Sequence, residues 1–171
     1  MVKKITNAIS GKNTLTGASA MASAFIPIFT TLLSQKKEKE AWLVATSVIN
    51  LALIVLVFFS IVLFFIMPYV APLIVPGFDM ERKDLTINLA RIMLGSPILF
   101  GLSYILGGIL NSYKRFLVYS LAPLVYNLVI ILGTYFFADK YSVTAVAISV
   151  VAGAFLHFLI QLPVAFKLGF R

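Results

Sequence analysis

The amino-acid sequence predicts an all-α membrane protein, a polytopic helical bundle with four full transmembrane helices and one short N-terminal helix. Of the 171 residues, 61% are hydrophobic and 12% are charged, whereas a soluble domain is usually about 45–50% apolar with about 25% charge. Charge this scarce cannot cover a water-soluble surface, so most of the exterior must face lipid. The long apolar segments are apolar on every side and lack strict alternation, which favours helices over a membrane β-barrel.

The first element is expected at residues 17–34, after a cytoplasmic segment at 1–16; residues 17–171 are expected to form a single transmembrane domain. The run begins with the small residues GASAMASA and continues as FIPIFTTLLS. Its length allows one crossing at most. We expect a short, partly embedded helix whose small residues serve as packing surface.

Four longer apolar segments follow, each with enough residues to cross a hydrocarbon core of about 30 Å. They are residues 42–67, 85–110, 117–138 and 143–167. Between the first two, Pro68, Pro72, Pro76 and Gly77 are expected to stop a helix and form a partly embedded loop. Within the later spans, Pro97, Pro123 and Pro163 are expected to kink or hinge their helices.

The distribution of lysine and arginine predicts the orientation of these spans. If residue 42 starts on the cytoplasmic side, seven basic residues lie inside and three outside. The inside set is Lys36, Lys37, Lys39, Lys114, Arg115, Lys167 and Arg171, and the outside set is Arg82, Lys83 and Lys140. This orientation puts the C-terminus in the cytoplasm. The same rule asks for an even number of crossings between the N-terminal lysines and Lys36, which residues 17–34 cannot supply.

Several classes of function find no support in the composition. The chain has no cysteine and one histidine, and its six acidic residues lie in or beside the expected loops. We therefore expect no enzyme active site, no metal centre and no cofactor. A nucleic-acid partner would need a soluble basic face, which a membrane bundle does not offer. The net charge of +8 is instead expected to meet anionic lipid headgroups.

Polar residues inside the spans are the candidates for binding, above all Arg91. Its guanidinium could contact an anionic headgroup such as a pyrophosphate, because it pairs bidentately with phosphate; the alternative is that it reaches back to the outer interface. Asn50 and Asn127 are further candidates for substrate contact. For these two, and for His157 and Gln161, the alternative is hydrogen bonding between helices.

Several stretches in order make the chain similar to a known family. They are SAFIPIF, APLIVPGF, LARIMLGSPILFGLSYILGGILNSYKRF, LAPLVYNLVII and QLPVAFKLGF. Over residues 24–171 the chain resembles the MurJ/MviN family, lipid II flippases of the multidrug/oligosaccharidyl-lipid/polysaccharide exporter superfamily. The resemblance implies transport of a lipid-linked peptidoglycan precursor by alternating access in the bacterial inner membrane. Membrane lipids and that precursor are the implied partners.

The resemblance also implies that family members have about fourteen helices in two lobes, of which this chain matches the later part of the first lobe. A stretch like TLTGASAM and one like SAFIPIF are separated in the family by most of a helical hairpin, whereas here they meet at Met21 and Ala22. We therefore expect the chain to be part of a flippase that is inactive alone. The alternative is a small non-transporting bundle that acts as a scaffold or oligomer subunit.

Overall fold

The computed structural model describes residues 17–170, with side chains from Phe25 onward, and every element in this range is helical. The helices are α2 (Gly17–Ser34), α3 (Glu38–Ile74), α4 (Met80–Met93), α5 (Gly95–Ser112), α6 (Phe116–Tyr141), α7 (Val143–Leu159) and α8 (Leu162–Lys167). Helix α5 continues α4, and α8 continues α7. The described residues therefore contain four spans that are long and apolar enough to cross a membrane, namely α3, α4–α5, α6 and α7–α8, beside the shorter α2. The predicted fold class is confirmed. The predicted segment 1–16 and Arg171 lie outside the described residues.

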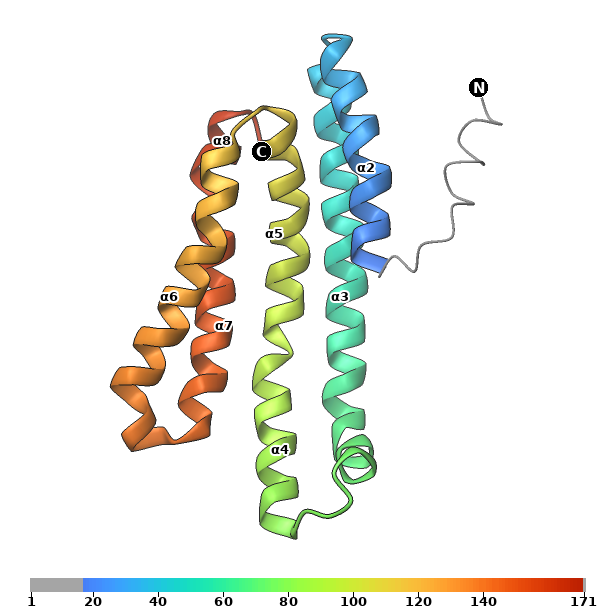
Figure 1. The fold of residues 1–171 in the computed structure, drawn as a ribbon. Coiled ribbons are helices and arrows are strands. Elements are labelled where there is room, and N and C mark those ends of the chain that lie inside the picture. Colours follow the sequence, from blue (N-terminus) through green and yellow to red (C-terminus); the bar gives the residue numbers. More distant parts are fainter. Residues whose placement is uncertain (1–16, 171) are drawn as a thin grey trace.

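Helix α5 lies at the centre of the bundle, between α2 and α3 on one side and α6 and α7 on the other (Figure 1). Its C-terminal half is buried without interruption from Ile105 to Leu110. The two glycines in this stretch allow close approach, since a Cβ on Gly107 would lie 2.7 Å from the Tyr119 ring and one on Gly108 would lie 3.0 Å from Ile26. The sequence ILGGIL is thus a packing surface, as small residues commonly are between membrane helices.

Helices α6 and α7 form a hairpin, and their contact is the most extensive between any two of the described helices. The turn between them is a single residue, Ser142, which adopts a positive φ of 50°. A Cβ on Gly153 would lie 2.9 Å from the Tyr126 ring and 3.0 Å from the Tyr126 carbonyl oxygen. Glycine at this position is therefore what lets α7 lie directly against the backbone of α6.

An aromatic cluster joins α2, α3, the α5–α6 turn and the C-terminal residues at one end of the bundle. The Trp42 ring lies 5.8 Å from Phe29, 6.3 Å from Tyr113 and 6.0 Å from Phe170, measured between ring centroids. Phe29 is fully buried among them. Burial, followed by the negative charge of Glu38, raises the pKa of the Tyr113 hydroxyl, so this side chain stays neutral across the physiological range.

Helix α3 is longer than predicted, because Pro68 and Pro72 do not stop it. The helix continues through both prolines to Ile74 and ends there, two residues before Pro76. Val75, the residue before Pro76, has φ −121° and ψ 62°, because a following proline disfavours the α conformation. Membrane helices tolerate internal proline where a neighbouring helix satisfies the freed carbonyl, and Arg91 does this for Pro68, as described below.

The expected embedded loop between the first two spans is also shorter than predicted, since only residues 75–79 are non-helical. Asp79 explains where α4 begins: its side chain accepts a hydrogen bond of 2.9 Å from the backbone N–H of Arg82. This is the usual N-cap arrangement, in which a side chain satisfies a free N–H of the first turn. The second span therefore starts at Met80 rather than near residue 85.

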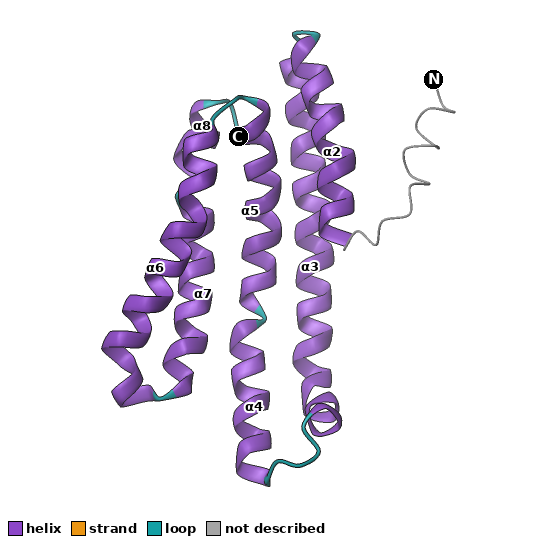
Figure 2. Ribbon diagram, viewed as in Figure 1, coloured by secondary structure: helices purple, strands orange, loops and turns teal. Residues whose placement is uncertain are grey.

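Two of the four spans are interrupted, and each interruption follows from a proline (Figure 2). Helix α4 ends at Met93 and α7 ends at Leu159, four residues before Pro97 and Pro163 respectively. A proline has no N–H to donate to the carbonyl four residues earlier, and its ring clashes with that carbonyl. The predicted hinges at Pro97 and Pro163 thus coincide with breaks, whereas α6 runs through Pro123 without one.

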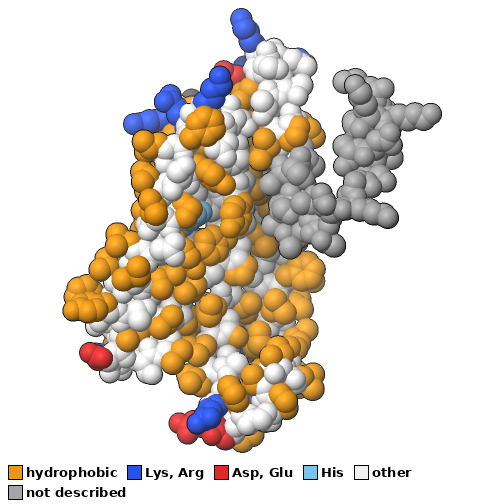
Figure 3. All heavy atoms as spheres, in the orientation of Figure 1, with side chains coloured by type: hydrophobic (Ala, Val, Ile, Leu, Met, Phe, Trp, Pro, Cys, Tyr) orange, Lys and Arg blue, Asp and Glu red, His pale blue; other side chains and the backbone are white. Residues whose placement is uncertain are grey.

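The outer surface is apolar along the body of the bundle and charged at its two ends (Figure 3). Large side chains that face outward include Phe58, Phe65, Leu124, Ile131 and Tyr135. In the most apolar stretch of α3, and likewise of α6, only 6% of the residues are buried inside the bundle. These two helices therefore present most of their surface outward, as expected of helices in contact with lipid.

Candidate functional site

Arg91 on α4 is bound to the backbone of α3. Its Nε donates a hydrogen bond of 3.1 Å to the carbonyl oxygen of Phe64, and its guanidinium carbon lies 4.6 Å from the centre of the Phe64 ring. Pro68 stands four residues after Phe64 and has no N–H, so this carbonyl lacks its usual helical partner. Arg91 thus supplies the donor that Pro68 removes, and the cation also gains a cation–π contact.

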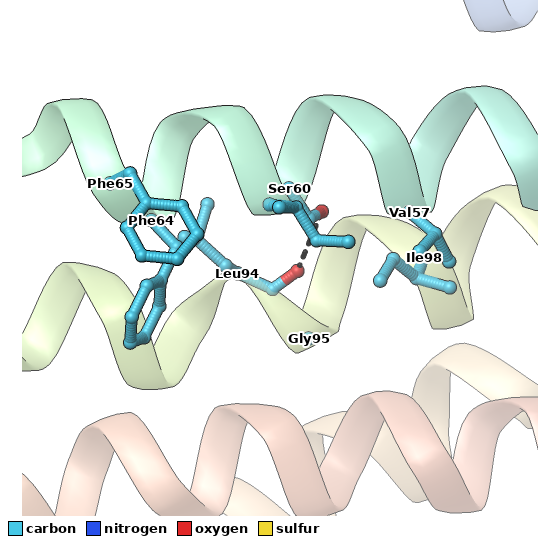
Figure 4. Close-up of a pocket in the computed structure, with 8 residues that line it drawn as sticks. Val57, Ser60, Phe64, Phe65, Leu94, Gly95 and Ile98 are labelled. Carbon is cyan, nitrogen blue, oxygen red and sulfur yellow. Dashed lines mark hydrogen bonds between the residues drawn. The ribbon is translucent and has the colours of Figure 1, made fainter.

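A second hydrogen bond between the same helices lies one helical turn away, at the break between α4 and α5. Ser60 Oγ on α3 donates to the carbonyl oxygen of Leu94 over 3.3 Å (Figure 4). Ser60 and Phe64 are four residues apart, so they share one face of α3. The two hydrogen bonds connect the turn of α3 that precedes Pro68 to the residues beside the α4–α5 break.

Beside these bonds, α3 and the α4–α5 break line an open cleft of about 380 Å³. Its lining is apolar except for the Ser60 hydroxyl: Val57, Ser60, Ile61, Phe64, Phe65, Leu94, Gly95 and Ile98. Figure 4 shows the Phe64 and Phe65 rings at one end and Val57 and Ile98 at the other. Arg91 contacts the backbone and ring of Phe64 and so stands at the edge of this cleft.

Asn50 and Asn127, the other two predicted contact residues, are not brought together with Arg91. Both side chains are exposed on outward faces, Asn50 on α3 and Asn127 on α6. The Asn127 amide donates 2.9 Å to the carbonyl of Pro123 within its own helix. Asn50 precedes Phe64 by 14 residues on α3, about 21 Å along the helix axis. The three predicted residues thus do not form one site within the described chain.

A buried polar network connects α5 to the break between α7 and α8. Gln161 Nε2 donates to Ser103 Oγ at 2.5 Å and to the His157 carbonyl at 3.1 Å, and Ser103 Oγ lies 2.6 Å from His157 Nδ1. All three side chains are at most 6% exposed. Interhelical hydrogen bonding, which the sequence left open for His157 and Gln161, is therefore confirmed. Ser103 was missed, because a single serine in an apolar helix carries no distinguishing pattern.

The geometry of this network fixes the orientation of the Gln161 amide. The His157 carbonyl can only accept, so the atom 3.1 Å from it must be the Gln161 Nε2 donor. Ser103 Oγ also lies 3.4 Å from the His157 carbonyl oxygen, so its hydroxyl hydrogen has two acceptors within reach, this carbonyl and His157 Nδ1. Gln161 Oε1 is buried with no partner among the described residues. The network holds the α7–α8 break against α5 and presents no nucleophile to solvent.

Metal chemistry has no apparent ligand set within the part of the chain that the structure describes, where no three His, Cys, Asp or Glu side chains cluster. The two ion pairs recorded there, Lys37 with Glu40 and Arg82 with Asp79, lie on exposed ends of helices. What remains within the spans is a membrane bundle with one clamped arginine, one buried polar network and two proline breaks. Proline breaks of this kind are positions at which membrane helices can bend.

Comparison with known proteins decides the family. Residues 12–171 match the family model described as "Lipid II flippase MurJ". The chain belongs to the MurJ family of lipid II flippases. A probable lipid II flippase MurJ of Buchnera aphidicola subsp. Schizaphis graminum is 31% identical over 153 residues, covering 87% of this chain and 30% of the relative.

Two further MurJ relatives have a similar extent of match. The probable lipid II flippase MurJ of Rickettsia prowazekii is 33% identical over 77% of this chain and 26% of its own length. The lipid II flippase MurJ of Thermosipho africanus is 30% identical over 83% of this chain and 29% of its own length. The chain therefore spans less than a third of the length of these MurJ proteins, and belongs to a family of transporters rather than of catalytic enzymes.

Proposed function

We propose that this chain takes part in moving a lipid-linked peptidoglycan precursor across the bacterial inner membrane, as one portion of a larger alternating-access transporter. The observation that carries the proposal is the MurJ match over residues 12–171, together with four helices able to span a membrane. The breaks before Pro97 and Pro163 support it, because interrupted helices are where transporters commonly bend around a substrate.

Within that function, Arg91 is the proposed contact for the anionic headgroup, with Asn50 and Asn127 as further polar contacts. Arg91 uses Nε for the Phe64 carbonyl, and the described residues offer no acceptor for its two Nη groups. Those groups keep the planar donor pair that binds phosphate oxygens bidentately. Asn50 and Asn127 are exposed, so both can meet a substrate or another part of the transporter.

The proposed orientation places the C-terminus in the cytoplasm. Among the described residues, Lys36, Lys37, Lys39, Lys114, Arg115 and Lys167 lie at the end of the bundle that carries the α2–α3 and α5–α6 turns, while Arg82, Lys83 and Lys140 lie at the other. The bias supports a basic end facing the cytoplasm. Because the chain has no cysteine, single cysteines at Lys114 and at Ser142 test it directly. Labelling of position 114 but not 142 by an impermeant reagent added outside intact cells would contradict the orientation.

Growth of bacteria depleted of their own MurJ tests the function. Because the chain spans under a third of its relatives' length, we propose that the 171 residues alone do not restore growth. A chimera in which Glu38–Lys167 replaces the matching helices of the depleted bacterium's MurJ should restore it. Growth on the chain alone would refute dependence on further helices, and a chimera that inserts stably without restoring growth would refute the flippase function.

A further inference from the structure

The end of the bundle that carries most of the basic residues has a crevice that the transport proposal does not use. It lies between the start of α6 and helix α8 and measures about 440 Å³. Its lining consists of Arg115, Leu117, Val118, Val164, Lys167 and Leu168. Two cations and four aliphatic side chains thus share one hollow where the first turn of a spanning helix meets the charged end of the bundle.

The charged part of the crevice is suited to an anion. Arg115 and Lys167 are both exposed, and within residues 25–170 neither has a carboxylate in ion-pair distance, since the recorded pairs are Lys37–Glu40 and Arg82–Asp79. Helix α6 begins at Phe116 with no side-chain cap, so its first N–H groups add partial positive charge. The acidic Glu38 lines a separate depression that shares only Leu168 with the crevice.

The apolar part of the crevice is suited to a hydrocarbon chain. Leu117 and Val118 stand in the first turn of α6, and Val164 and Leu168 are one turn apart at α8. A free phosphate would leave these side chains unused, and the ammonium of a zwitterionic lipid would be repelled by the two cations, Arg115 and Lys167. A ligand that carries one negative phosphate and an acyl chain uses both halves of the crevice.

We propose that this crevice binds one anionic phospholipid, with its phosphate between Arg115 and Lys167 and an acyl chain along Val118, Val164 and Leu168. The site sits at the end of the bundle that carries six of the ten basic residues described, where the headgroup of a lipid beside a spanning helix would lie. It holds a structural lipid of the surrounding membrane and is independent of whether the chain transports anything.

Native mass spectrometry of the purified 171-residue chain in detergent, titrated with dioleoyl phosphatidylglycerol, tests the site. The Arg115→Gln/Lys167→Gln variant should bind this lipid about thirtyfold more weakly, which is ~2 kcal/mol at ~1 kcal/mol per cation. The matched control is Lys36→Gln/Lys39→Gln, which removes the same charge from the same end and should change affinity by less than about threefold. Equal losses in both variants would overturn the proposal in favour of diffuse attraction.

Two further experiments distinguish recognition of the lipid headgroup from recognition of the acyl chain. Dioleoyl phosphatidylcholine should bind the native chain much more weakly, and inorganic phosphate at millimolar concentration should not displace the anionic lipid. Val164→Trp keeps every charge and fills the crevice, and it should weaken lipid binding while the far-UV circular dichroism spectrum stays unchanged. Equal binding of both lipids, displacement by phosphate, or undiminished binding to a folded Val164→Trp variant would each overturn the assignment.

Discussion

Replacing Pro68 with alanine is expected to make Arg91 nearly dispensable for stability. In the native chain the Phe64 carbonyl accepts its hydrogen bond from Arg91 Nε at 3.1 Å, because Pro68 has no N–H to offer. Alanine at this position restores a backbone N–H four residues after Phe64, inside a helix that already continues to Ile74. The carbonyl then has a partner within its own helix, and Arg91 is no longer needed there.

The size of the effect follows from the two contacts of Arg91. A hydrogen bond to a charged group contributes about 1.5–3 kcal/mol and an exposed cation–π contact about 0.5–1 kcal/mol. Since Arg91 is only half-buried, Arg91→Leu should lower the free energy of unfolding by about 2 kcal/mol in the native background. In the Pro68→Ala background only the cation–π part is lost, so the cost should fall below about 1 kcal/mol, a coupling of at least about 1 kcal/mol.

Equilibrium unfolding of the native chain, both single variants and the double variant measures this coupling. The chain has one tryptophan, Trp42, whose stacking on Tyr113 makes its fluorescence a probe of the packed bundle in detergent. Additive losses, within about 0.5 kcal/mol, would refute the clamp. In the flippase chimera the same double variant distinguishes a structural role of Arg91 from a role in substrate binding. If Arg91 contacts the headgroup, the double variant should regain stability but still fail to transport the precursor.

Two further predictions concern packing and the buried network. Ser103→Ala should lower the free energy of unfolding by about 2–3 kcal/mol, because it leaves His157 Nδ1 and one Gln161 hydrogen buried without partners. The control is Ser47→Ala at an exposed position, which should lower the free energy of unfolding by less than about 0.5 kcal/mol. Thermal unfolding compares the two variants, and equal losses of stability would contradict the network. Gly153→Ala should lower the free energy of unfolding by about 1–3 kcal/mol, because the added methyl group forces α7 away from α6. Gly77→Ala is the control and should be nearly neutral, because its methyl group meets nothing within 4 Å. An equally small effect of Gly153→Ala would contradict the close packing of the hairpin.

Much of the fold was predictable because lipid leaves little choice of structure. Apolar runs long enough to span must be helical where the backbone has no water to bond, and the predicted spans at 117–138 and 143–167 lie within a few residues of α6 and the α7–α8 pair. The predicted N-terminal helix also agrees with α2 in its bounds. Its partial embedding stays a prediction, as does the division into a segment at 1–16 and a single domain.

The errors arose where a distant residue overrides a local preference. Pro68 and Pro72 locally favour a helix end, and the donor supplied by Arg91, 27 residues from Phe64, explains why α3 continues past Pro68. Nothing among the described residues supplies a comparable donor for Pro72. The Ser103 network joins residues 54 and 58 positions apart, so no local pattern reveals it. The roles of Arg91, Asn50 and Asn127 in substrate contact stay predictions, since exposure and a backbone contact leave their partners in the whole transporter undefined.

Transport of the precursor itself tests the central claim, that these helices serve as a working portion of a lipid II flippase. Membrane vesicles from MurJ-depleted cells, loaded with labelled lipid II, would report its arrival in the outer leaflet. The chimera carrying Glu38–Lys167 should move the precursor within about tenfold of the unaltered flippase, one order of magnitude or ~1.4 kcal/mol in barrier, while the 171 residues alone stay at background. Background transport by a stably inserted chimera, or transport by the chain alone, would contradict the claim.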